Sequence, residues 1–120
     1  MIQTAEEFIQ YKVEQFKKGG LIKVKDISRK GFHYWKREAW TFIPQSNYDG
    51  KVFVIERLKR VKSDLKSTKL GDIEYRFGYY IVGKIGRANG KWVWGQFCPL
   101  IPAEDFQKLL DKAKREGTLK

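Results

Sequence analysis

The chain has 120 residues and a formal net charge of +11, with 42% hydrophobic and 15% aromatic residues. This size suits one domain of residues 1–120, and this hydrophobic content indicates a packed core rather than a disordered chain. No apolar run approaches the ~18 residues of a membrane span, no secretory leader opens the chain, and the single cysteine excludes an internal disulfide framework. We therefore expect a reducing, cytoplasmic setting and no membrane association.

The first predicted element is a helix over residues 4–18. Thr4 and Glu7 form a capping-box pair, in which each side chain accepts a hydrogen bond from the other residue's backbone amide. Apolar residues then recur at helical spacing until Gly19, which is a typical helix terminator. This helix is expected to pack against the rest of the domain.

Three strands are predicted next, over residues 21–27, 32–43 and 51–61. In the first segment, Ile22 and Val24 alternate with Lys23 and Lys25, whereas the other two segments contain runs of aromatic and β-branched residues. Turn-forming residues separate the three segments. A basic loop through Asp72 follows the third strand. Residues 56–70 also fit helical spacing, so strand, helix and loop all stay open for this stretch.

The clearest sheet signal is a β-hairpin of residues 74–85 and 91–98. Asn89-Gly90 is typical of a two-residue hairpin turn and would place Ile85 opposite Trp94. Because side chains alternate, two faces result. The expected core face carries Phe77, Tyr79, Ile81, Ile85, Trp92, Trp94 and Cys98. The other face, half apolar and half basic, carries Arg76, Tyr80, Val82, Lys84, Lys91, Val93 and Phe97.

A closing helix is predicted over residues 102–116, because Pro102 suits a first turn and an apolar stripe follows it. The order is helix, about five strands, helix, and the short connections favour an antiparallel meander. Glycines within the strands allow sharp bending. The predicted fold class is therefore α+β, with a strongly curled sheet or small open barrel flanked by an N-terminal and a C-terminal helix.

Charge and aromatic residues are concentrated in the same part of the chain. Residues 21–100 hold 17 of the 25 basic groups, only 7 of the 14 acidic groups, and 14 of the 18 aromatic residues. Concentrated positive charge attracts polyanions, and exposed aromatic rings stack on nucleic-acid bases. The leading hypothesis is therefore a non-enzymatic nucleic-acid-binding module for single-stranded or structured RNA or DNA.

Three groups of residues are candidates for this interface. The hairpin contributes Arg76, Tyr80, Lys84, Arg87, Lys91 and Trp92, although Tyr80 and its apolar neighbours could instead pack under a helix. A basic run contributes Arg57, Lys59 and Arg60, followed by Lys62, Lys66 and Lys69. A third cluster has Arg29, Lys30, Lys36 and Arg37 around the aromatic residues Phe32, His33, Tyr34 and Trp35.

Two other functions compete with this hypothesis. The same basic, aromatic surface could bind an acidic protein partner. A small nuclease or toxin-like ribonuclease would need His33, or Asp72 with Glu74, as its catalytic groups. Cys98 precedes a proline on the expected core face and is interpreted as buried and inert. No cofactor is predicted, because the sequence has no recognisable set of metal or cofactor ligands.

Overall fold

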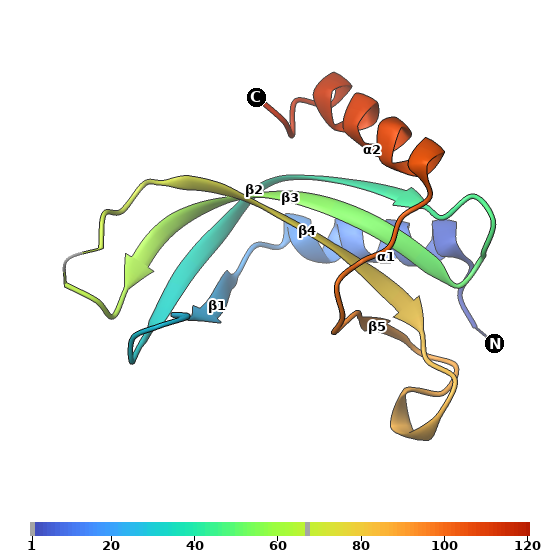
Figure 1. The fold of residues 1–120 in the computed structure, drawn as a ribbon, viewed down its shortest axis with the longest axis horizontal. Helices are drawn as coiled ribbons and strands as arrows, with labels where there is room; N and C mark the ends of the chain where they lie inside the picture. The colour runs from blue at the N-terminus through green and yellow to red at the C-terminus, as the bar shows by residue number, and fades with distance from the viewer. Residues whose placement is uncertain (1, 67) are drawn as a thin grey trace.

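The computed structural model describes residues 2–66 and 68–120; Ser67, in the predicted basic loop, and Met1 lie outside the described residues. The described chain begins and ends with a helix, and the five strands of one sheet lie between them in sequence (Figure 1). The elements are α1 (Ala5–Lys17), β1 (Leu21–Lys25), β2 (Phe32–Pro44), β3 (Lys51–Ser63), β4 (Ile73–Val82), the short 3-10 helix η1 (Gly86–Ala88), β5 (Trp92–Trp94) and α2 (Ala103–Arg115).

The sheet is a meander in which each strand pairs antiparallel with the next, in the order β1-β2-β3-β4-β5. The strands twist and curl into an open half-barrel, so that β1 and β5 are its two edges (Figure 1). This confirms the predicted fold class. It also settles residues 56–63, which continue β3 as strand rather than forming a helix or a loop.

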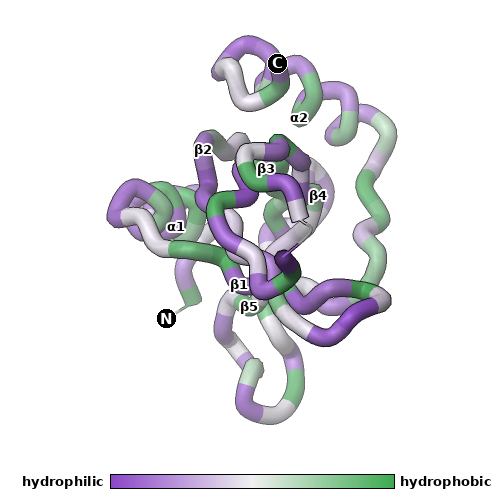
Figure 2. Tube along the Cα trace, turned by 90° about the vertical axis from the view of Figure 1, so that its left-hand side faces the viewer, coloured by the Kyte–Doolittle hydropathy of each residue, from purple (hydrophilic) through white to green (hydrophobic). Residues whose placement is uncertain are grey.

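The two helices cover opposite faces of the sheet (Figure 2). Alternation along β3 sends Val52 and Val54 toward α1 on the concave face, and Phe53 and Ile55 toward α2 on the convex face. Because all four side chains are at most 5% exposed, β3 is the centre of both hydrophobic clusters. Burial of each such side chain stabilises the fold by roughly 1.5–3 kcal/mol.

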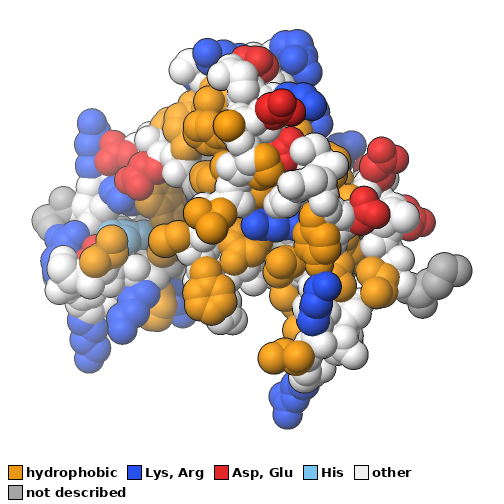
Figure 3. All heavy atoms as spheres, turned by 45° about the vertical axis from the view of Figure 1, so that its right-hand side comes forward, with side chains coloured by type: hydrophobic (Ala, Val, Ile, Leu, Met, Phe, Trp, Pro, Cys, Tyr) orange, Lys and Arg blue, Asp and Glu red, His pale blue; other side chains and the backbone are white. Residues whose placement is uncertain are grey.

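Neither helix packs on the far half of the sheet, which we call the distal half: β1, residues 32–36 of β2, residues 58–63 of β3, and the start of β4 (Figure 1). The contacts of α1 and α2 lie near the other ends of β2 and β3. Basic side chains gather on the left of Figure 3, which is the distal half. The outer surface of this half is therefore a strand surface without a helix on it.

The predicted register of the β4–β5 hairpin is wrong. Tyr80 pairs with Trp94 and Val82 with Trp92, so the turn is a longer loop over residues 83–91 rather than Asn89-Gly90 alone. Gly83 anchors this loop by exchanging backbone hydrogen bonds with Gly90 and Lys91. Because the register differs by an odd number of positions, both tryptophans lie on the face of Tyr80 rather than on the predicted core face.

The interpretation of Cys98 as a buried residue is also wrong. Strand β5 ends at Trp94, and the next residues run as an irregular segment toward α2. Cys98 is exposed there, and its neighbour Phe97 is 81% exposed. The predicted strand over residues 91–98 is thus too long. The amide of Gly95 still donates a hydrogen bond to the carbonyl oxygen of Tyr79 in β4, and beyond Gly95 the chain crosses toward the convex face.

Candidate nucleic-acid interface

The structure separates the candidate residues of the hairpin. Lys84, Arg87 and Lys91 are exposed around the β4–β5 loop. Trp92 is half-buried: its ring stacks on Phe8 of α1 with centroids 4.6 Å apart, and its Nε1 donates to a backbone carbonyl. Tyr80 is only 6% exposed beneath α1, so its ring packs under a helix instead of offering a stacking platform.

Arg57 and Arg60 of the basic run are engaged within the fold. Arg57 donates to the carbonyl oxygens of Gly117 and Thr118 and thereby holds the end of α2. Arg60 pairs with Asp72 and Glu74, 3.4 and 3.5 Å away, and its guanidinium also lies over the Trp35 ring. Lys59, between them in sequence, points outward and is exposed.

Asp72 and Glu74, the proposed nuclease carboxylates, are therefore partners of one arginine. Among residues 2–66 and 68–120, no three His, Cys, Asp or Glu side chains are grouped closely enough to hold a metal ion. Neither helix within these ranges is long and apolar enough to cross a membrane.

His33 is 7% exposed, and both of its ring nitrogens have partners. Nε2 lies 2.7 Å from Asp26 Oδ1, and Nδ1 lies 2.9 Å from Ser63 Oγ. In a serine-hydrolase triad, Nδ1 faces the carboxylate and Nε2 faces the serine. In this protein the two partners are exchanged. Ser63 Oγ also accepts a hydrogen bond from the backbone amide of Leu65. These contacts join two loops of the distal half and leave no ring nitrogen for a substrate.

Acid should weaken this junction through Asp26. Hydrogen bonds from His33, then Arg29, and then the amide of Ser28 hold the pKa of Asp26 well below its ordinary value. A carboxylate with a lowered folded-state pKa stabilises the fold above its unfolded pKa, near 3.9, and loses that contribution as the pH falls further. In urea titrations between pH 7 and pH 3, we expect Asp26→Asn to show a shallower loss of stability than the parent chain. Parallel profiles would contradict this role.

The two remaining basic clusters meet on the convex surface of the distal half. In β2, His33 and Trp35 point inward and are buried, so Tyr34 and Lys36 point outward. The register sets Lys36 between Leu21 of β1 and a lysine of β3, and sets Tyr34 between lysines of both neighbouring strands. We call this surface the lysine face, and it consists of Lys23, Tyr34, Lys36, Lys59 and Lys62.

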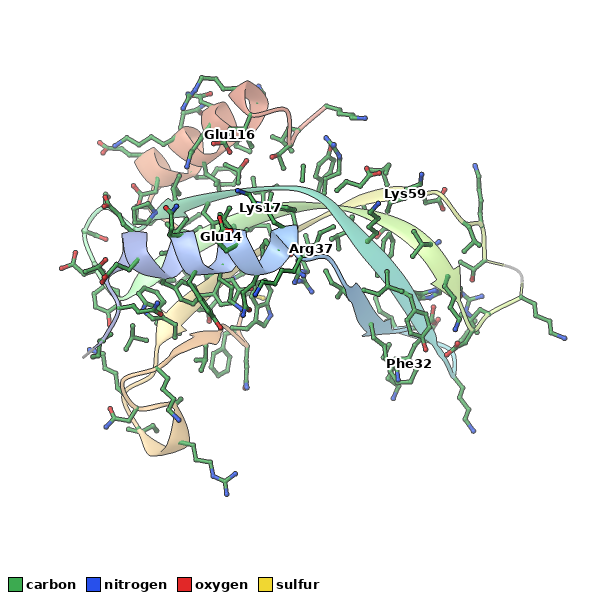
Figure 4. All side chains as sticks on the ribbon, turned by 180° about the vertical axis from the view of Figure 1, so that it is seen from behind. Glu14, Lys17, Phe32, Arg37, Lys59 and Glu116 are labelled. Atoms are coloured by element: carbon green, nitrogen blue, oxygen red, sulfur yellow. The ribbon has the colours of Figure 1, made fainter. Side chains whose placement is uncertain are left out.

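The lysine face carries uncompensated charge. Its four lysines are exposed, and none forms an ion pair with the acidic groups of the described chain. Lys36 stands directly opposite Lys59, although like charges at paired positions destabilise a sheet. The ammonium of Lys62 lies 5.0 Å from the centroid of the Tyr34 ring. Figure 4 shows Lys59 and Phe32 in the part of the sheet beyond the helices.

Lys23 is the member of this face that was not among the candidates predicted from the sequence. Its signal was the alternation of Ile22 and Val24 with Lys23 and Lys25 in β1, which implies an outward basic row. The other four members belonged to two clusters that were separate in sequence. Only the β2–β3 pairing brings those clusters together.

Fold and site together define a small α+β domain with a curled antiparallel sheet and a basic, aromatic strand surface. The chain matches no family model, and no curated protein and no solved structure is similar enough to count as a match.

Proposed function

We propose that this chain is a non-enzymatic, cytoplasmic nucleic-acid-binding module, which holds single-stranded or structured RNA or DNA on the lysine face. The observation that carries the proposal is the set of four exposed lysines without acidic partners, grouped around Tyr34 on a surface that no helix covers. A polyanion that neutralised Lys36 and Lys59 would relieve their mutual repulsion.

Binding in this proposal is driven by phosphate neutralisation. Each lysine that contacts a phosphate releases condensed counterions, so affinity falls steeply as salt rises. The partly exposed ring of Tyr34 offers a stacking surface for an unpaired base. Since neither helix lies on this face, no recognition helix reads base edges, and we expect modest sequence discrimination.

The test is a fluorescence-anisotropy titration of labelled single-stranded RNA, single-stranded DNA and duplex DNA at several salt concentrations. Replacing Lys59 and Lys62 together with glutamine should weaken binding about tenfold and reduce the slope of log K against log salt by about 1.4, or ~0.7 per lost phosphate contact. Both side chains are exposed, so the doubly substituted chain should keep its stability.

The matched control is the double change Lys108→Gln and Lys114→Gln on α2, which removes the same charge from exposed positions away from the lysine face. Equal losses from both double variants would show that net charge alone drives binding and would contradict the proposed face. Absence of binding at low salt to all three nucleic acids, with retained binding of polyglutamate, would instead favour the acidic protein partner.

A further inference from the structure

A second cationic site lies on the other side of the sheet, in the gap between its two edge strands. It is an open groove of about 430 Å³ between β1 and β5, with a lysine of α1 at its rim. Small-molecule sites have volumes of roughly 300–1,000 Å³, so the groove can hold a ligand of nucleotide size. The side chains that matter for its chemistry are Lys12, Arg37, Arg76, Tyr80 and Trp94.

The floor of the groove is built around one buried carboxylate. Glu56 has no exposed surface, and the Nε atoms of Arg37 and Arg76 each donate to one of its oxygens. The Arg76 contact is 2.7 Å long. The terminal Nη atoms of both arginines make no hydrogen bond to the described parts of the chain. Glu56 thus fixes two guanidinium groups and leaves their forked ends available.

Positive charge in the groove exceeds what Glu56 can neutralise. With three cations against one carboxylate, two positive charges lack a counter-charge. The Nζ atom of Lys12 lies 5.0 Å from the Tyr80 ring centroid and has no carboxylate within ion-pair distance among the described residues. Burial, and then the charge of Arg37, lower the pKa of Lys12. A bound anion would offset the repulsion between Lys12 and Arg37.

An aromatic wall stands beside these cations. The ring of Trp94 packs against Gly78, where a Cβ atom would come within 2.3 Å of it. The Arg76 guanidinium is 4.8 Å from the ring, and Tyr80 packs against it edge-on at 5.0 Å. Burial, and then Glu56, raise the pKa of Tyr80 to about 12, so its hydroxyl stays neutral near pH 7. Trp94 is 36% exposed and can accept a planar group.

We propose that this groove binds a phosphate monoester attached to a planar aromatic base. The forked ends of Arg37 and Arg76 suit phosphate oxygens, and a dianionic phosphate matches the two uncompensated charges. Trp94 then stacks on the base. Such a ligand is either a free mononucleotide or the 5′-phosphorylated end of a nucleic acid. Arg37 lies beside the end of α1 (Figure 4) and points to the concave side of the sheet, whereas its neighbour Lys36 points to the convex side. The groove is therefore separate from the lysine face, and this proposal does not depend on the proposed function.

The experiment follows tryptophan fluorescence and binding heat during titration with adenosine 5′-monophosphate, adenosine and inorganic phosphate. We expect the monophosphate to bind at least tenfold more tightly than adenosine, and Lys12→Met to remove about tenfold of that affinity. Lys12 has no ion pair to lose and methionine keeps its apolar stem, so the variant should fold, as circular dichroism can verify. The change Lys17→Met on the same helix is the matched control.

Two further arms identify the source of the phosphate. Tighter binding of a 5′-phosphorylated than of a 5′-hydroxyl oligonucleotide, lost in Lys12→Met, would assign the groove to strand ends. Tight binding of the monophosphate alone would assign it to free nucleotides. Equal affinity for adenosine and its monophosphate, or an unchanged affinity of Lys12→Met, would overturn the proposal. The Lys59 and Lys62 double variant should keep monophosphate binding. The two proposals can therefore be tested, and can fail, independently of each other.

Discussion

Replacing Glu56 with glutamine should lower the free energy of unfolding by about 3–5 kcal/mol, the cost of removing one partner from a buried ion pair. Glu56 is fully buried and is the acceptor for both Arg37 and Arg76. A glutamine side chain fits the same space but carries no charge. Two guanidinium groups would then remain close together on the concave face without their counter-ion.

Urea denaturation at pH 7 is the measurement, with Glu38→Gln as the matched control. Glu38 also pairs with an arginine across the sheet, at 3.3 Å, but its side chain is 27% exposed. Pairs near solvent contribute about 0–1 kcal/mol, so the control should have a small effect. If Glu56→Gln cost no more than Glu38→Gln, the buried carboxylate would not organise the concave face.

The second large effect is expected from Gly95→Ala, which should destabilise the fold by about 1–3 kcal/mol. A Cβ atom at position 95 would come within 2.1 Å of the Tyr79 ring. That ring cannot easily move, because it is 7% exposed and belongs to the hydrophobic cluster under α2. The overlap outweighs the ~0.4–1 kcal/mol that alanine contributes by restricting the unfolded chain.

A double-mutant cycle with Tyr79→Leu identifies the cause of this effect. Leucine lacks the part of the ring that the new methyl group would meet, so Gly95→Ala should cost at least 0.5 kcal/mol less in the Tyr79→Leu background. Additive costs in thermal and urea denaturation would show that contacts other than the Tyr79 ring set the effect.

The elements with strong local signals were predicted well. The capping box of Thr4 and Glu7 forms as expected, and α1 spans Ala5–Lys17 within the predicted residues 4–18. The predicted hairpin register is wrong because Asn89-Gly90 forms only part of the turn. Gly83 and Gly86 add a wider loop there: a Cβ atom on Gly83 would collide with Ala88, and Gly86 has a φ of +62°. Such close approaches depend on the folded loop and have no local sequence signature.

The sites could be predicted only in part, because both depend on pairing between strands. Lys36 and Lys59 were recognised within separate basic clusters, but only the β2–β3 register makes them opposite neighbours. Glu56 was the one sequence signal for the groove: it follows an apolar run in β3 and lies on the same face of the strand as Val52 and Val54. Arg37 reaches Glu56 from a position next to an irregularity in the β2–β3 pairing. The position of such an irregularity cannot be predicted from the spacing of residues in the sequence.

The meander topology influences how the chain folds. Each strand pairs only with its neighbour in sequence, so strand pairing never has to wait for a distant segment. The entropy lost on closing a connection grows with its length, so pairing of strands that are neighbours in sequence costs less than pairing of distant ones. The 13-residue strands β2 and β3 contribute to both hydrophobic clusters, and their hairpin is the natural folding nucleus. We therefore expect the transition state to contain this hairpin, with α1 and α2 docking afterwards from opposite sides.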